Sequence, residues 1–125
     1  RADRGYWEKA PNASALAAAD KIVELLRSAD IPEARVTYNR GHIAMGTTGY
    51  NFCWFHRRIA PHFRMECKVE STIRDAVVTS LQGKGIDASA KRSDIVGLTM
   101  TLQGLETHGV VVLDMLKQAE EFSKR

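Results

Sequence analysis

The spacing of apolar residues divides the chain into helices and strands, beginning with a helix. Between residues 12 and 29, apolar positions recur every three or four residues, which places them on one face of a helix. Asn12 or Ser14 can cap this helix, and Ile31 ends it because the residue before a proline avoids the helical conformation. We expect its buried face to consist of Leu16, Ala19, Ile22, Val23 and Leu26.

From residue 36 the apolar spacing changes to two, which is typical of β-strands with one buried face. Glycine-containing turns at residues 39–42 and 46–49 separate the first strands, and Pro61 lies in the loop after the third strand. The pattern therefore predicts four consecutive antiparallel strands, over residues 36–39, 43–45, 50–58 and 62–70.

The second half of the chain uses both kinds of spacing again. We expect a helix that begins at Ser71 or Thr72, a hairpin over residues 86–91 and 95–102, and a closing helix over residues 103–123. The predicted order is α-β-β-β-β-α-β-β-α. This order is typical of an α+β fold, in which a mainly antiparallel sheet of about six strands, arranged as hairpins, carries helices mostly on one face.

The start of the chain is polar apart from Tyr6 and Trp7. We expect residues 1–11 to form an N-terminal arm that docks through these two aromatic side chains, and residues 12–125 to form a single domain. The chain begins with Arg1 rather than with methionine, from which we expect it to be part of a larger protein.

The orientation of the central hairpin depends on its register, because strand 50–58 is apolar on both faces whereas strand 62–70 alternates. If the loop centres on Ala60, Cys53 lies opposite Cys67. The outer face then carries Phe52, Trp54, His56 and Arg58 beside Arg64, Glu66 and Lys68. A shift of one residue puts the two aromatic side chains inside and exposes Cys53, Phe55 and Arg57. We favour the first register because it buries a thiol and a phenyl ring.

Basic side chains gather around this hairpin, in a chain whose net charge is +3 and whose pI is about 9.0. A mildly basic chain suits an anionic partner. Aromatic faces can stack on nucleobases, and neighbouring arginine and lysine side chains can neutralise phosphates. The sequence therefore predicts a non-catalytic binding module that contacts DNA or RNA. The residues expected to form its surface are Phe52, Trp54, His56, Arg57, Arg58, His62, Arg64, Lys68 and Arg40.

Two other interpretations of the same segment stay open. In one, Phe52 and Trp54 pack beneath a helix or the N-terminal arm, and the basic side chains are ordinary solvated surface. In the other, these two aromatic side chains anchor a protein–protein contact, either in a homodimer or with other domains of a parent protein. The exposure of Trp54 therefore decides how the segment is interpreted.

The sequence offers no residue set that we would assign to catalysis, a metal or a cofactor. The four histidines lack the spacing of zinc ligands, and no glycine-rich phosphate loop is present. Glu66 and Lys68 have the acid-x-lysine spacing of a nuclease strand, but an upstream acid at a suitable strand position is missing.

Cys53 and Cys67 lie in apolar contexts, so we expect reduced, buried thiols and a cytoplasmic protein. No apolar stretch is long enough for a membrane span, and we expect no membrane partner.

Two segments resemble a family of uncharacterised prokaryotic domains. They are residues 36–45, VTYNRGHIAM, and residues 51–55, NFCWF. In that family a YNKxYIG strand pair is followed by an NNFVxF strand and a basic loop. The start around Trp7 and the closing helix are also similar, so the resemblance extends over most of the chain. It departs at residues 56–59, where the family has RPKK. The resemblance implies an accessory module of a larger protein, sometimes beside DNA-processing components, with a binding role more than a catalytic one.

Overall fold

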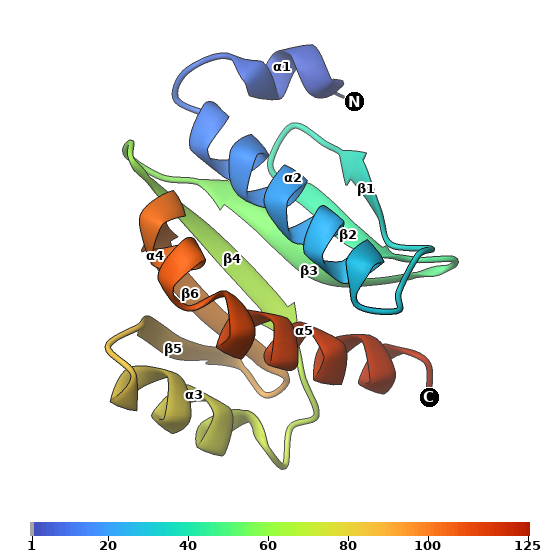
Figure 1. The fold of residues 1–125 in the computed structure, drawn as a ribbon, viewed down its shortest axis with the longest axis vertical. Coiled ribbons are helices and arrows are strands. Elements are labelled where there is room, and N and C mark those ends of the chain that lie inside the picture. Colours follow the sequence, from blue (N-terminus) through green and yellow to red (C-terminus); the bar gives the residue numbers. More distant parts are fainter. Residues whose placement is uncertain (1) are drawn as a thin grey trace.

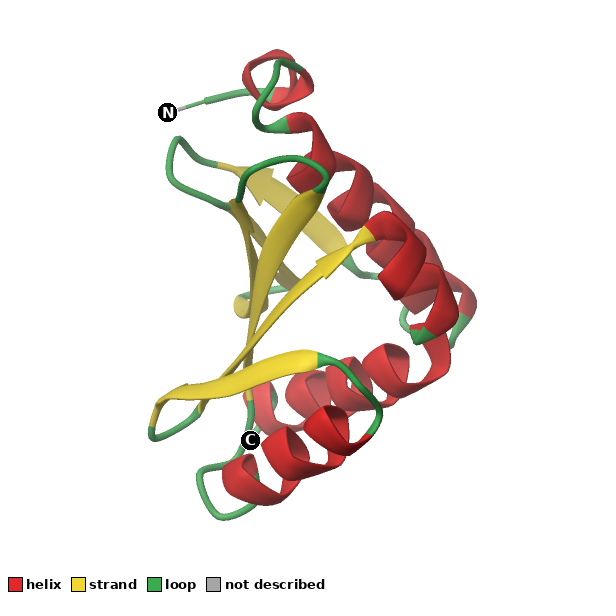
Figure 2. Ribbon diagram, turned by 90° about the vertical axis from the view of Figure 1, so that its left-hand side faces the viewer, coloured by secondary structure: helices red, strands yellow, loops and turns green. Residues whose placement is uncertain are grey.

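The computed structural model describes residues 2–125, which form a six-stranded antiparallel sheet with helices on one of its faces (Figures 1 and 2). The strands lie side by side in the order β1-β2-β3-β4-β6-β5. In chain order the elements are α1 (Arg4–Glu8), α2 (Ala13–Ser28), β1 (Arg35–Tyr38), β2 (Ile43–Thr47), β3 (Tyr50–Arg57), β4 (His62–Lys68), α3 (Arg74–Gly83), β5 (Asp87–Arg92), β6 (Ile95–Thr101), α4 (Leu102–Thr107) and α5 (Gly109–Ser123). The predicted α+β class and element order are confirmed.

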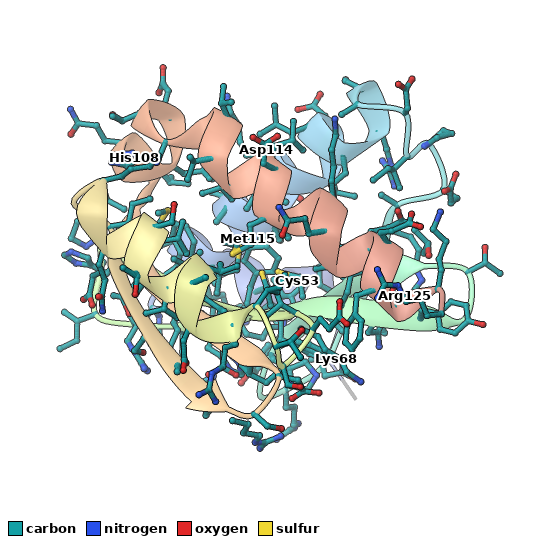
Figure 3. All side chains as sticks on the ribbon, turned by 90° about the horizontal axis from the view of Figure 1, so that it is seen from below. Cys53, Lys68, His108, Asp114, Met115 and Arg125 are labelled. Atoms are coloured by element: carbon teal, nitrogen blue, oxygen red, sulfur yellow. The ribbon has the colours of Figure 1, made fainter. Side chains whose placement is uncertain are left out.

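The core fills the layer between the sheet and the helices. α2 and α5 lie against the central strands β3 and β4, while α3 covers β5 and α4 covers the end of β6. Met115 of α5 points into this layer towards the region of Cys53, whereas Asp114 lies on the solvent side of the helix (Figure 3). The largest fully buried side chains are Trp7, Phe52, Phe55, Phe63, Ile22, Leu26, Ile43, Met45, Met65, Leu98, Leu105 and Leu116.

The closing helix is divided at His108 instead of being continuous. Thr101 caps α4, because its hydroxyl oxygen accepts a hydrogen bond from the backbone N–H of Gly104 at 3.0 Å. The short α4 keeps Leu105 buried beside β6, and the break lets α5 change direction and cross β3 and β4. Apolar spacing alone did not reveal this break.

The first residues form a short helix that holds the turn between β1 and β2. Trp7 of α1 is completely buried, and its indole N–H donates to the carbonyl oxygen of Asn39 at 2.8 Å. The hydroxyl of Tyr6 donates to the carbonyl oxygen of Arg40 in the same turn, at 3.3 Å. Arg4 binds the carboxylate of Asp20 with two hydrogen bonds, at 2.7 and 2.9 Å, which fix α1 against α2.

The central hairpin has the register that we favoured. Cys53 lies opposite Cys67, and Phe55 lies opposite Met65. These side chains all face the helices and are fully buried. The two thiols are 3.5 Å apart and are not joined by a disulfide. Burial raises the pKa of the Cys53 thiol well above its usual value, because the low-dielectric core disfavours a thiolate.

The expected outward orientation of Phe52 is wrong. Met45 pairs with Cys53 and Gly46 pairs with Asn51, so Phe52 is an extra residue in β3 at an irregularity of the ladder. This irregularity reverses the alternation at one point, and Phe52 and Cys53 are both buried in the core. Phe52 therefore belongs to the core and cannot contribute to a binding surface.

Candidate functional site

The face of the sheet that points away from the helices is uncovered over the described residues (Figure 2). Strands alternate their side chains, so Trp54 and His56 of β3 share this face with Arg64, Glu66 and Lys68 of β4. An antiparallel sheet tolerates one solvated face, and such a face normally carries polar side chains. A half-buried tryptophan on this face is therefore unusual, and its surroundings form the candidate site.

A cleft of about 230 Å³ opens on this face beside Trp54. It is called the outer-face cleft below. Its lining residues are His42, Trp54, His56, Glu66, Lys91, Arg92 and Ile95. They come from the turn before β2, from the ends of β5 and β6 and from within β3 and β4, so the cleft depends on the strand order of the sheet rather than on a local motif.

Glu66 is the central polar residue of the cleft, and only 8% of it is exposed. Its Oε2 accepts hydrogen bonds from Lys91 Nζ at 2.7 Å and from Arg64 Nε at 3.2 Å. Burial alone would raise the pKa of Glu66, but the hydrogen bonds from Lys91 and Arg64 outweigh it and hold the pKa below its usual value. Glu66 is therefore an ionised, firmly oriented carboxylate at neutral pH.

Arg64 lies flat on the sheet rather than reaching into solvent. Its guanidinium group occupies the space above Gly97 that any larger side chain would fill, and Nη1 donates to the Thr99 hydroxyl at 3.3 Å. Only 17% of the Arg64 side chain is exposed. The guanidinium group of Arg64 is paired with the carboxylate of Glu66. This arginine therefore orients the carboxylate and is not a free cation for a ligand.

His56 adds an imidazole ring to the edge of the cleft. Burial lowers the pKa of His56, and the nearby carboxylate of Glu66 only partly opposes this effect. Nε2 of His56 is 3.3 Å from Oε1 of Glu66, but the two atoms do not have hydrogen-bond geometry, and Nε2 is buried without a partner. The His42 ring lies next to it, with the ring centres 6.0 Å apart.

Several predicted site residues lie away from the cleft, at the end of the sheet. Arg57, Arg58 and Arg40 are exposed near α1 and the loop between β3 and β4. Nη1 of Arg57 donates to the Tyr6 hydroxyl at 3.4 Å, which in turn donates to the backbone of Arg40. His62 lines a different pocket, together with His108.

The predicted residues thus fall into separate groups. Trp54 and His56 line the cleft, and Arg64 lies beside it and binds Glu66. Lys68 is on the same face of the sheet; its side chain is 44% exposed and lies 4.0 Å from the carboxylate of Asp94. Sequence reasoning missed Lys91 and Arg92. Both belong to β5, which joins the sheet through β6, and β6 in turn pairs with β4. No local signal in the sequence indicates that order.

Comparisons with protein-family models, curated proteins and solved structures found no match to this chain. The resemblance to the uncharacterised prokaryotic family therefore stays a prediction. Among residues 2–125, no helix has the length and apolar character that a membrane crossing requires. The same residues contain no group of three or more histidine, cysteine, aspartate or glutamate side chains arranged to hold a metal ion.

Proposed function

We propose that this chain is a non-catalytic binding domain that contacts single-stranded nucleic acid through the uncovered face of its sheet. The observation that carries the proposal is Trp54, a half-buried indole that lines an open cleft on a face without helices. Nucleobases stack on such aromatic rings in a sequence-tolerant way, and single strands expose their bases for stacking.

Exposed cations around the cleft support contacts to the phosphate backbone. Lys68, Lys91 and Arg92 surround Trp54 from β4 and β5, and the side chains of Lys68 and Lys91 are 44% and 46% exposed. Arg57 and Arg58 extend the basic surface to the end of the sheet. Arg64 and Lys91 already donate hydrogen bonds to Glu66. The cations most available to bind phosphate are therefore Lys68, Arg92, Arg57 and Arg58.

The chemistry of the cleft favours binding over catalysis. Glu66 is tied to two cations that hold its pKa low, so it is a poor proton acceptor. Both cysteines lie on the opposite face of the sheet, buried beneath the helices. Among the described residues that line the cleft, none is a serine or a cysteine that could act as a nucleophile beside His56.

The proposal is tested by fluorescence anisotropy with labelled single-stranded DNA and RNA of roughly 12 nucleotides. We expect saturable binding at low salt, and Trp54→Ala should weaken it about 5- to 100-fold because one stacked base is lost. Tyr50→Ala is the matched control, since it removes an exposed aromatic side chain outside the cleft and should leave the affinity unchanged. Absence of binding to every oligonucleotide at low salt would overturn the proposal.

The same assay identifies the phosphate contacts. We expect Lys68→Ala and Arg92→Ala each to lower the dependence of log K on log salt by about one unit. Lys117→Ala removes the same charge from α5 on the helical side and should leave the slope unchanged. Equal effects of all three substitutions would mean that net charge alone, rather than the outer face, determines binding.

The protein-interaction alternative loses one of its two expected anchors because Phe52 is buried. Dimerisation by pairing of the edge strand β5 with the same strand of a second copy is also disfavoured. Gln82 donates to the carbonyl oxygen of Ala88 at 2.9 Å, and Arg74 donates to that of Arg92, so α3 already occupies these backbone acceptors. Sedimentation at increasing concentration distinguishes the alternatives. A tight dimer that protects Trp54 from acrylamide quenching would count against the nucleic-acid proposal.

A further inference from the structure

Glu66 lines the outer-face cleft, and within residues 2–125 its Oε1 accepts no hydrogen bond. Oε2 accepts both of the hydrogen bonds, from Lys91 and Arg64. Oε1 faces only Nε2 of His56, which is outside hydrogen-bond geometry. A mostly buried, ionised carboxylate with one unused oxygen favours a ligand that supplies an N–H group.

This oxygen lies beside the ring that would hold a base. Trp54 and Glu66 are directly opposite each other in the ladder between β3 and β4, and side chains at such positions are neighbours on one face. A flat ring stacked on the indole of Trp54 therefore has its edge near the Glu66 carboxylate. The cleft of about 230 Å³ is smaller than the roughly 300–1,000 Å³ of sites for drug-sized molecules, and this size suits a single base.

We propose that the outer-face cleft holds one base of the bound strand and selects a base with an exocyclic amino group. This inference rests on the proposed function. The amino group of adenine, cytosine or guanine donates to Oε1 of Glu66. The ammonium group of Lys91, which lies 2.7 Å from Oε2, then donates to the unprotonated ring nitrogen next to that amino group.

Two other ligand groups fit the cleft less well. The imide N–H of thymine and uracil is flanked by two carbonyl oxygens, which the carboxylate repels. A phosphate group carries the same sign of charge as Glu66, so phosphates are expected at Lys68 and Arg92 outside the centre of the cleft. Arg64 and Lys91 hold the carboxylate in place before a ligand arrives, so little ordering is needed on binding.

The inference is tested by measuring the binding of wild-type protein to oligocytidine, oligoadenine and oligothymine DNA of equal length. We expect oligocytidine and oligoadenine to bind about tenfold more tightly than oligothymine, as for one hydrogen bond to a charged group. A sharper probe is oligocytidine with N4,N4-dimethylcytosine, which keeps the ring but has no amino N–H. It should bind about tenfold more weakly than unmodified oligocytidine.

Glu66→Gln should reduce the preference for cytosine over its dimethyl analogue to less than about threefold, because the charged acceptor is lost. Glu70→Gln is the matched control. It makes the same change of charge at a carboxylate that binds Arg125 near the end of α5, and it should keep the preference. If Glu66→Gln does not fold, the comparison of the two cytosine oligonucleotides with wild-type protein decides alone.

The possible failures are distinguishable. Equal affinity for cytosine and its dimethyl analogue would overturn this inference and leave the proposed function intact. A preference that Glu66→Gln retains in full would overturn the role of Glu66. Absence of binding to all of these oligonucleotides would overturn the proposed function itself.

Discussion

At the scale of single residues, Gly46 makes the inward turn of Phe52 possible. The ladder between β2 and β3 becomes irregular at Met45 and Gly46, where the backbone of Tyr50 and Asn51 passes directly over Gly46. Any Cβ atom at this position would collide with that backbone, which has no flexible end that can move aside. A glycine at this position therefore allows the irregular pairing that buries a phenyl ring and leaves Trp54 as the main aromatic side chain of the outer face.

We expect Gly46→Ala to lower the free energy of unfolding by about 1–3 kcal/mol, because the methyl group forces the two strands apart. Gly41→Ala is the matched control, since the space around Gly41 is open and its φ is not positive. Urea unfolding followed by circular dichroism measures both variants. Equal stability of the two alanine variants would show that the close approach at Gly46 does not constrain the hairpin.

At the scale of elements, the sequence predicts what depends on local periodicity and misses what depends on contacts between distant segments. The strands and the long helix α2 follow from spacings of two and of three to four residues, and the hairpin register follows from burial of Cys53. The irregularity at Phe52 depends on the backbone of a neighbouring strand, and the break at His108 depends on which strands α5 covers. Lys91 enters the candidate site through the strand order alone.

The short helix α1 is the element whose contribution is most easily measured. Trp7→Phe keeps an aromatic ring but leaves the Asn39 carbonyl oxygen without its indole donor. We expect a loss of about 1–3 kcal/mol in unfolding free energy, because the carbonyl oxygen becomes an unpaired polar group beside the core. Tyr6→Phe removes only longer, exposed hydrogen bonds, to Arg40 and from Arg57, and should change stability by less than about 0.5 kcal/mol in the same urea titration. Similar losses in both variants would contradict this assignment.

At the scale of the whole molecule, the two faces of the sheet have opposite chemistry. The helices lie against one face of the sheet only (Figure 2). That face is apolar and contains both cysteines, while the other face carries a tryptophan, two histidines and a network of charges. Because the network at Glu66 is partly buried, its charge state contributes to the stability of the entire fold. The candidate site and the global stability are therefore linked through pH.

Acid should destabilise the protein in two stages. His56 and Glu66 both have a lowered pKa in the folded protein, so the unfolded chain binds more protons and stability falls as the pH decreases. For His56 the loss begins as the pH falls through its unfolded pKa near 6.5, and for Glu66 it begins near 4.5. Unfolding free energies from urea titrations between neutral pH and about pH 3 measure both stages.

His56→Gln should remove the first stage and keep the second, because it replaces the half-buried imidazole by a side chain that does not titrate. His62→Gln replaces an exposed histidine outside the cleft and should keep both stages. A wild-type stability that stays constant from pH 7 to about pH 5 would contradict the lowered pKa of His56. A first stage that persists in His56→Gln would assign the loss to another group and separate the stability of the fold from the candidate site.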